Sequence, residues 1–232
     1  MNWITKNEFL FQLLALVVII IVVHGFYVGL IRPNAEAHMV AQLALQAAGQ
    51  DYVPSRSLSV VMRDYEQEAC LILLLWALSI MAYKWRHTTL ERALAQGTVL
   101  NIPEGMSVLP SDARSISRSI EALPVEQQDF LLPRTLASAL QRFATTQSIP
   151  AVADTVREHC ETEADRLDSE LSMIRYIAWA IPSIGFIGTV RGIGDALGQA
   201  YKAVEGDISG VTVSLGVAFN STFVALVLSI II

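Results

Sequence analysis

Four segments of this chain are apolar for long enough to cross a lipid bilayer. At about 1.5 Å per residue in an α-helix, the shortest covers about 26 Å and the longest about 37 Å, against a hydrocarbon core of about 30 Å. Hydrophobic residues make up 53% of the chain and charged residues only 16%, with a mean hydropathy of +0.47, which exceeds the range typical of soluble proteins. The sequence therefore predicts an all-α integral membrane protein with transmembrane helices at residues 9–31, 69–85, 176–200 and 211–232.

The distribution of basic residues predicts the orientation of these helices. Lys84 lies at the end of the second segment, Arg86 follows this segment and Arg175 precedes the third, and lysine and arginine gather in cytoplasmic loops. The region between the second and third segments is therefore expected in the cytoplasm. The N-terminus is expected there as well. The first segment could instead be a signal peptide, because residues 35–37 resemble a cleavage site, but its apolar core is too long. The expected domains are a first transmembrane helix (1–31), a periplasmic loop (32–67), a second transmembrane helix (68–85), a helical cytoplasmic domain (86–172) and a core of two further transmembrane helices (173–232), after which the chain is expected to continue into the cytoplasm.

The third segment combines high apolarity with a row of small residues. At roughly 100° per residue, five residues fall on or beside about one third of the helix surface: Pro182, Gly185, Gly188, Thr189 and Gly192. Small residues on one face let helices approach closely in a membrane. We therefore expect a packing surface with a hinge at Pro182, and a Thr189 hydroxyl that points toward a neighbouring backbone or a pore. The alternative is that Thr189 only bonds to a carbonyl of its own helix, as threonines in transmembrane helices often do.

The fourth segment carries a row of hydroxyls that includes Ser214, Ser221 and Thr222. Thr189 and Thr222 both lie near the middle of their segments, so we expect the two hydroxyls at one depth on neighbouring antiparallel helices. The pattern predicts an ion path lined by Thr189, Thr222, Ser221 and Ser214. No Asp, Glu or Lys lies at that depth, so a titratable group would have to come from another chain. The first two segments carry no such row and are expected to face lipid.

Two charges lie near the outer end of the third segment. Arg191 and Asp195 are four residues apart, about one helical turn, and can therefore form an ion pair. A charge in a membrane is costly unless it is paired. We expect a pair, within or between subunits, that holds the outer mouth of an assembly. The alternative is that Asp195 is itself a carboxylate of the ion path.

No catalytic constellation is found in the sequence. Phosphate-binding loop, zinc-protease, CxxC and nucleophile-elbow motifs are missing, and the glycines of the third segment do not follow a strand, as a dinucleotide-binding turn would. The four histidines are scattered, the two cysteines lie in segments expected in different compartments, and no basic patch contains interleaved aromatic residues. We therefore expect no enzymatic activity, no cofactor, no metal site and no nucleic-acid partner.

Two motifs in the last two segments resemble the MotA/TolQ/ExbB proton-channel family. They are Pro182 with residues 185–192 (GFIGTVRG) in one segment and residues 215–222 (LGVAFNST) in the next. The resemblance implies a homopentamer around two single-span partner subunits, each with a membrane aspartate. It also implies that Thr189 and Thr222 match hydroxyls that line the ion path, and that Pro182 matches a proline at the cytoplasmic end of the third helix. Arg191 and the Asn220-Ser221 pair depart from the usual pattern of the TolQ/ExbB branch.

The resemblance implies a ring-forming subunit of a bacterial inner-membrane motor that is driven by an ion-motive force. The transported ion would be H⁺, with Na⁺ as the alternative, and the assembly would lie in membrane lipid. Four segments combined with these threonines look most like ZorA, the motor subunit of the Zorya anti-phage system. The alternatives are a non-conducting membrane scaffold or receptor, and a Tol/Ton-type or flagellar-stator-type energiser.

Overall fold

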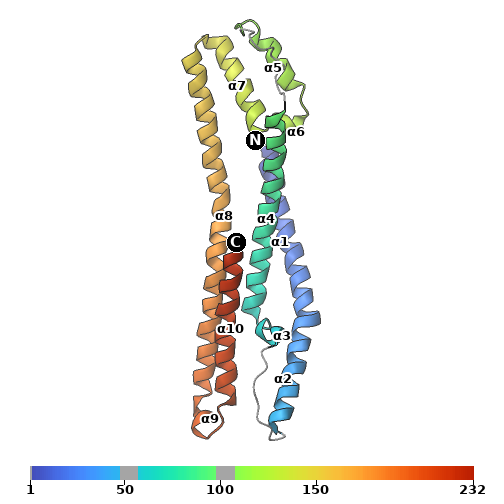
Figure 1. Cartoon of the computed structure of the whole chain (residues 1–232), viewed down its shortest axis with the longest axis vertical. Helices are drawn as coiled ribbons and strands as arrows, with labels where there is room; N and C mark the ends of the chain where they lie inside the picture. Colours follow the sequence, from blue (N-terminus) through green and yellow to red (C-terminus); the bar gives the residue numbers. More distant parts are fainter. Residues whose placement is uncertain (1, 48–56, 98–107) are drawn as a thin grey trace. The chain divides into compact units, whose positions relative to one another are not determined.

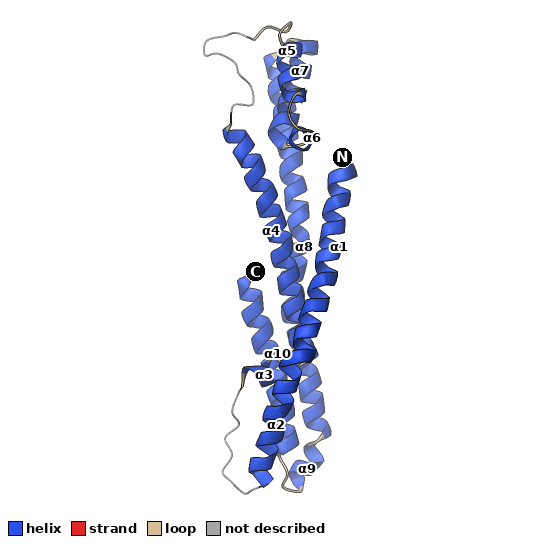
Figure 2. Cartoon of the chain, turned by 90° about the vertical axis from the view of Figure 1, so that its right-hand side faces the viewer, coloured by secondary structure: helices blue, strands red, loops and turns tan. Residues whose placement is uncertain are grey.

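The structure, a computed structural model, describes residues 2–47, 57–97 and 108–232, and every element in these ranges is a helix (Figures 1 and 2). Within these ranges, four helices are long and apolar enough to cross a membrane, which confirms the predicted fold class. Parts of the expected loop 32–67 and of the expected domain 86–172 lie outside the described residues. The elements are α1 (Asn2–Phe26), the π-helical turn η1 (Tyr27–Ile31), α2 (Arg32–Ala47), α3 (Leu58–Val61), α4 (Tyr65–Gln96), α5 (Ala113–Glu121), α6 (Val125–Gln128), α7 (Leu131–Thr146), α8 (Ile149–Gly198), α9 (Ala200–Val204) and α10 (Ser209–Ile231).

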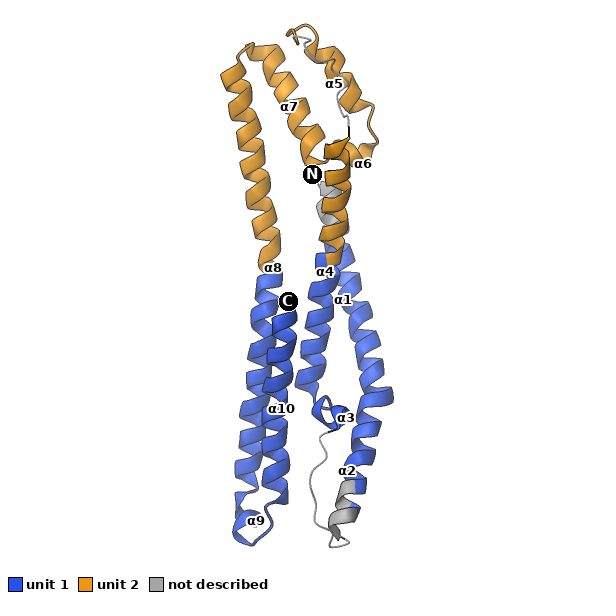
Figure 3. Ribbon diagram, in the orientation of Figure 1, with its two compact units in different colours: residues 1–81, 174–232 blue, residues 82–173 orange. Residues whose placement is uncertain are grey.

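The chain divides into two compact units (Figure 3). One unit contains residues 1–81 and 174–232, and the other contains residues 82–173. Helices α4 and α8 each contribute residues to both units. The first unit contains the glycines and hydroxyls singled out in the sequence.

Ion pairs organise the second unit. Glu163 of α8 is buried and accepts hydrogen bonds from Arg134 of α7 (2.6 Å) and from Arg166 (2.5 Å). Lys84 of α4 lies 2.7 Å from Glu170 of α8. Two acids of α8, Glu163 and Glu170, are therefore paired with basic residues of their own unit.

The apolar core of the first unit is built from α4, α8 and α10. Its largest fully buried side chains include Ile80 of α4 and Ile181 of α8, and the thiol of Cys70 lies 3.5 Å from the carbonyl oxygen of Ile181. The indole N–H of Trp76 donates to the carbonyl of Gln12 in α1 (3.1 Å). These contacts hold α4 between α1 and α8 in this unit.

Three glycines of α8 form its contact with α10. A β-carbon on Gly188 would lie 2.5 Å from the β-carbon of Ser221, and one on Gly192 would lie 2.7 Å from the carbonyl oxygen of Ser214. A β-carbon on Gly185 would likewise overlap Ala225. Contacts this short do not occur between real atoms, so the two backbones approach closely only because these side chains are missing.

The glycine contact generates a first prediction. Gly192→Ala should lower the free energy of unfolding by about 1–3 kcal/mol, because the added methyl group overlaps the α10 backbone. Gly194→Ala is the matched control on the same helix, since a β-carbon there meets nothing within 4 Å, and its higher helix propensity should raise stability by up to about 1 kcal/mol. Thermal unfolding in detergent, followed by circular dichroism, compares the two. Equal stability of both variants would contradict the described packing.

Candidate functional site

The hydroxyls of Thr189 and Thr222 meet between α8 and α10. They are hydrogen-bonded to each other. Thr189 Oγ1 also lies 3.1 Å from the carbonyl oxygen of Ala218 in α10 and 3.3 Å from that of Gly185 in α8, and Thr222 Oγ1 lies 3.2 Å from the same Gly185 carbonyl. Each hydroxyl has one proton to donate and two lone pairs, so the pair can exchange its mutual bond for bonds to either backbone.

The two interpretations of Thr189 from the sequence are therefore both represented in the structure. Its hydroxyl reaches a carbonyl of its own helix, as a locally bonded threonine would, and it also reaches across to Thr222 and Ala218. The helix-crossing bonds are possible because Gly185 and Gly188 let α10 approach. The close packing of the backbones brings the two hydroxyls together.

Ser221 and Ser214 lie on the same buried face of α10. Ser221 stands against Gly188, and its hydroxyl lies 3.5 Å from Nε2 of Gln67 in α4. Ser214 accepts a hydrogen bond from the amide of Gln199 (3.0 Å). The four hydroxyls named from the sequence thus share the α8–α10 contact, but only Thr189 and Thr222 bond directly to each other.

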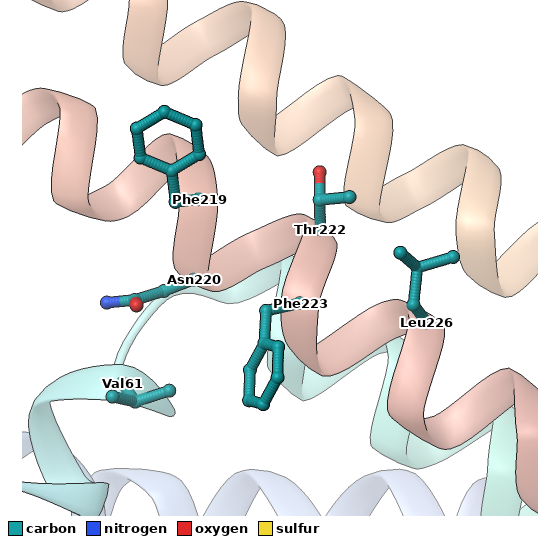
Figure 4. Close-up of a pocket in the computed structure, with 6 residues that line it drawn as sticks. All are labelled: Val61, Phe219, Asn220, Thr222, Phe223 and Leu226. Atoms are coloured by element: carbon teal, nitrogen blue, oxygen red, sulfur yellow. The ribbon is translucent and has the colours of Figure 1, made fainter.

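Beside the hydroxyl pair, α10 borders an open hollow of about 530 Å³. Figure 4 shows Thr222 extending toward the neighbouring helix while Phe223 extends to the other side of α10. The hollow is mostly apolar, and Asn220 adds an amide to it. Its lining residues are Val61, Phe219, Asn220, Thr222, Phe223 and Leu226.

Arg191 pairs with carboxylates at and just before the start of α4 rather than with Asp195. Its guanidinium lies 2.8 Å from Glu66 and 3.7 Å from Asp64, whereas Asp195 is exposed. Side chains on a helix lean toward its N-terminus, so Arg191 leans away from an acid located one turn later. The order of a basic residue followed by an acidic one is also the weaker arrangement for such pairs. The predicted Arg191–Asp195 pair is therefore replaced, within this chain, by a pair between α8 and the start of α4.

The first turn of α4 carries polar contacts that the sequence analysis missed. Glu68 is buried and binds two cationic groups, Arg32 at 2.5 Å and, when protonated, His24 at 2.7 Å. Glu66 binds Arg191, and Gln67 approaches Ser221. These three residues lie before the predicted second segment, residues 69–85, so the expectation for the first two segments does not concern them. The sequence signal for these contacts is that three consecutive polar residues stand directly before an apolar run.

The buried carboxylate generates a second prediction. Glu68→Gln should lower the free energy of unfolding by about 2 kcal/mol, because the amide leaves Arg32 without its counter-charge and hydrogen bonds to charged groups are worth about 1.5–3 kcal/mol. Glu36→Gln, at an exposed acid of α2, should change stability by less than about 0.5 kcal/mol. Thermal unfolding in detergent measures both, and equal midpoints for the two variants would exclude a structural role for Glu68.

The comparisons with known proteins fit this site. Residues 127–232 match the model of the MotA/TolQ/ExbB proton channel family, and no curated protein and no solved structure matches the chain. The matched range includes all of α7, α8, α9 and α10, and therefore both helices of the hydroxyl pair. The resemblance inferred from residues 185–192 and 215–222 is confirmed over this range.

Proposed function

Because residues 127–232 belong to the MotA/TolQ/ExbB proton channel family, we propose that this multi-pass membrane protein is the ring-forming subunit of an ion-driven motor in the bacterial inner membrane. The observation that carries the proposal is the bonded pair of Thr189 and Thr222 within the close glycine contact of α8 and α10. The pair lies within the matched range and beside an open hollow.

The chemistry of the pair suits a path for protons. A hydroxyl can accept one proton while it donates another, and the carbonyls of Gly185 and Ala218 offer alternative acceptors within reach. A hydroxyl does not hold a charge at neutral pH, so the carrier of the ion is a carboxylate of a partner. We assign this role to the membrane aspartate of a single-span subunit. Oxygen atoms alone would also serve Na⁺, and H⁺ is the ion that we propose.

The family resemblance implies a homopentamer around two such partners, and we propose that ion flux drives rotation of the ring against the central pair. The basic residues after α4 support a cytoplasmic N-terminus and a cytoplasmic second unit. No catalytic motif or cofactor enters this function. Four candidate spanning helices together with the Thr189/Thr222 pair favour the ZorA branch and a role in anti-phage defence.

Removing the two hydroxyls tests the proposal. Thr189→Val and Thr222→Val preserve the shape of the side chain, and an interhelical hydrogen bond in lipid is worth only about 0.6–1.7 kcal/mol, so both variants should fold and assemble. Proton flux should fall at least about tenfold. The full chain is reconstituted into liposomes together with a candidate single-span partner that carries a membrane aspartate, and a pH-sensitive dye reports proton uptake under an imposed gradient.

Thr212→Val is the matched control, because Thr212 is an exposed threonine of the same helix whose hydroxyl bonds to the carbonyl of Ile208 (3.0 Å). It should conduct as the unmodified chain does. Full flux in both Thr189→Val and Thr222→Val would show that the hydroxyl pair only packs the two helices and does not line the ion path. Absence of flux in the unmodified complex would overturn the proposed function altogether.

A further inference from the structure

We propose that the first turn of α4 is a positioning element that holds Thr189 and Thr222 against each other. Three consecutive residues of this turn, Glu66, Gln67 and Glu68, each contact a different neighbouring segment. The inference rests on the proposed function, because it gives these residues a role in shaping the ion path. It concerns residues outside the range that matches the family.

Glu66 holds α8 on both sides of Thr189. Its carboxylate lies 2.8 Å from the guanidinium of Arg191, two residues after Thr189. Its Cγ lies 3.2 Å from the position that a β-carbon of Gly188, the residue before Thr189, would occupy. The methylene group of Glu66 therefore packs against Gly188, and its carboxylate binds Arg191. Thr189 lies between these two residues of α8 in the sequence.

Gln67 makes the corresponding contact with α10. Its side chain is 1% exposed, and its Nε2 donates to the carbonyl of Val61 (3.0 Å) and lies 3.5 Å from the hydroxyl of Ser221. Ser221 directly precedes Thr222. Adjacent residues of α4 thus contact the immediate neighbours of both threonines, one on α8 and one on α10.

Two further observations support positioning rather than simple packing. The Oε1 atom of Gln67 is buried and has no hydrogen-bond partner among the described residues, and a buried acceptor without a donor costs free energy. An apolar residue would fill this place at lower cost, but it would lack the amide donor that bonds to the Val61 carbonyl and approaches Ser221. Glu68 then anchors the turn, because Arg32 and His24 bind its carboxylate from the opposite direction.

The test measures the geometry of the hydroxyl pair directly. In a C160S background, which removes the exposed thiol, the T189C/T222C pair should form an intramolecular disulfide rapidly in detergent with copper phenanthroline, identified by peptide mass. Arg191→Gln should slow this cross-linking at least about fivefold, because α8 loses its charge contact with Glu66. Gln67→Leu should slow it as well. Arg191→Lys keeps the charge and should retain at least about half of the rate.

Asp195→Asn is the matched control, since Asp195 is an exposed acid one turn from Arg191, and it should leave the rate unchanged. Circular dichroism of each variant separates loss of fold from loss of position. Unchanged cross-linking in both Arg191→Gln and Gln67→Leu would overturn the inference, and so would failure of the T189C/T222C pair to cross-link. Because the chain is measured without a partner or an ion gradient, these outcomes are independent of whether the complex conducts protons.

Discussion

The close approach of α8 and α10 is the contact on which the rest of the first unit depends. Gly188 and Gly192 leave no room for a β-carbon, so the two helices meet backbone to backbone. In a membrane, where lipid tails are as apolar as the side chains, such contacts supply much of the attraction between helices. The same contact places the hydroxyls of Thr189 and Thr222 within bonding distance. The glycine contact therefore accounts both for the packing of α8 against α10 and for the hydroxyl pair.

The charged side chains around this contact are paired with opposite charges from other segments. Arg191, Glu66 and Glu68 would each be unfavourable in an apolar surrounding, and each binds a group of opposite charge on another segment. Because the partners come from α1, α2, α4 and α8 of one unit, the charges link segments that are far apart in the sequence. Uncharged hydroxyls remain at the α8–α10 contact itself.

The sequence predicted the features that depend on local periodicity. Four apolar runs gave four helices, and the angular spacing of Gly185, Gly188 and Gly192 identified the face that meets α10. The partner of Arg191 could not be predicted in this way, because the local rule proposes Asp195 while the nearest carboxylate in space is 125 residues away in the chain. The contacts of Gln67 and Glu68 were missed for the same reason. Adjacent residues point about 100° apart on a helix, and only the arrangement of the neighbours decides what each one meets.

The π-helical turn η1 has a consequence for helical phase. His24 and Arg32 are eight residues apart, which in a regular α-helix would turn them roughly 80° away from each other. In η1 the N–H of Arg32 bonds to the carbonyl of Tyr27, five residues earlier, so this turn accommodates about one extra residue and takes back about 100° of rotation. The imidazole of His24 and the guanidinium of Arg32 consequently both face Glu68. A regular helix would reach the same alignment with a spacing of seven residues. The turn η1 therefore corresponds geometrically to a one-residue insertion that leaves the side chains before and after it on the same side of the helix.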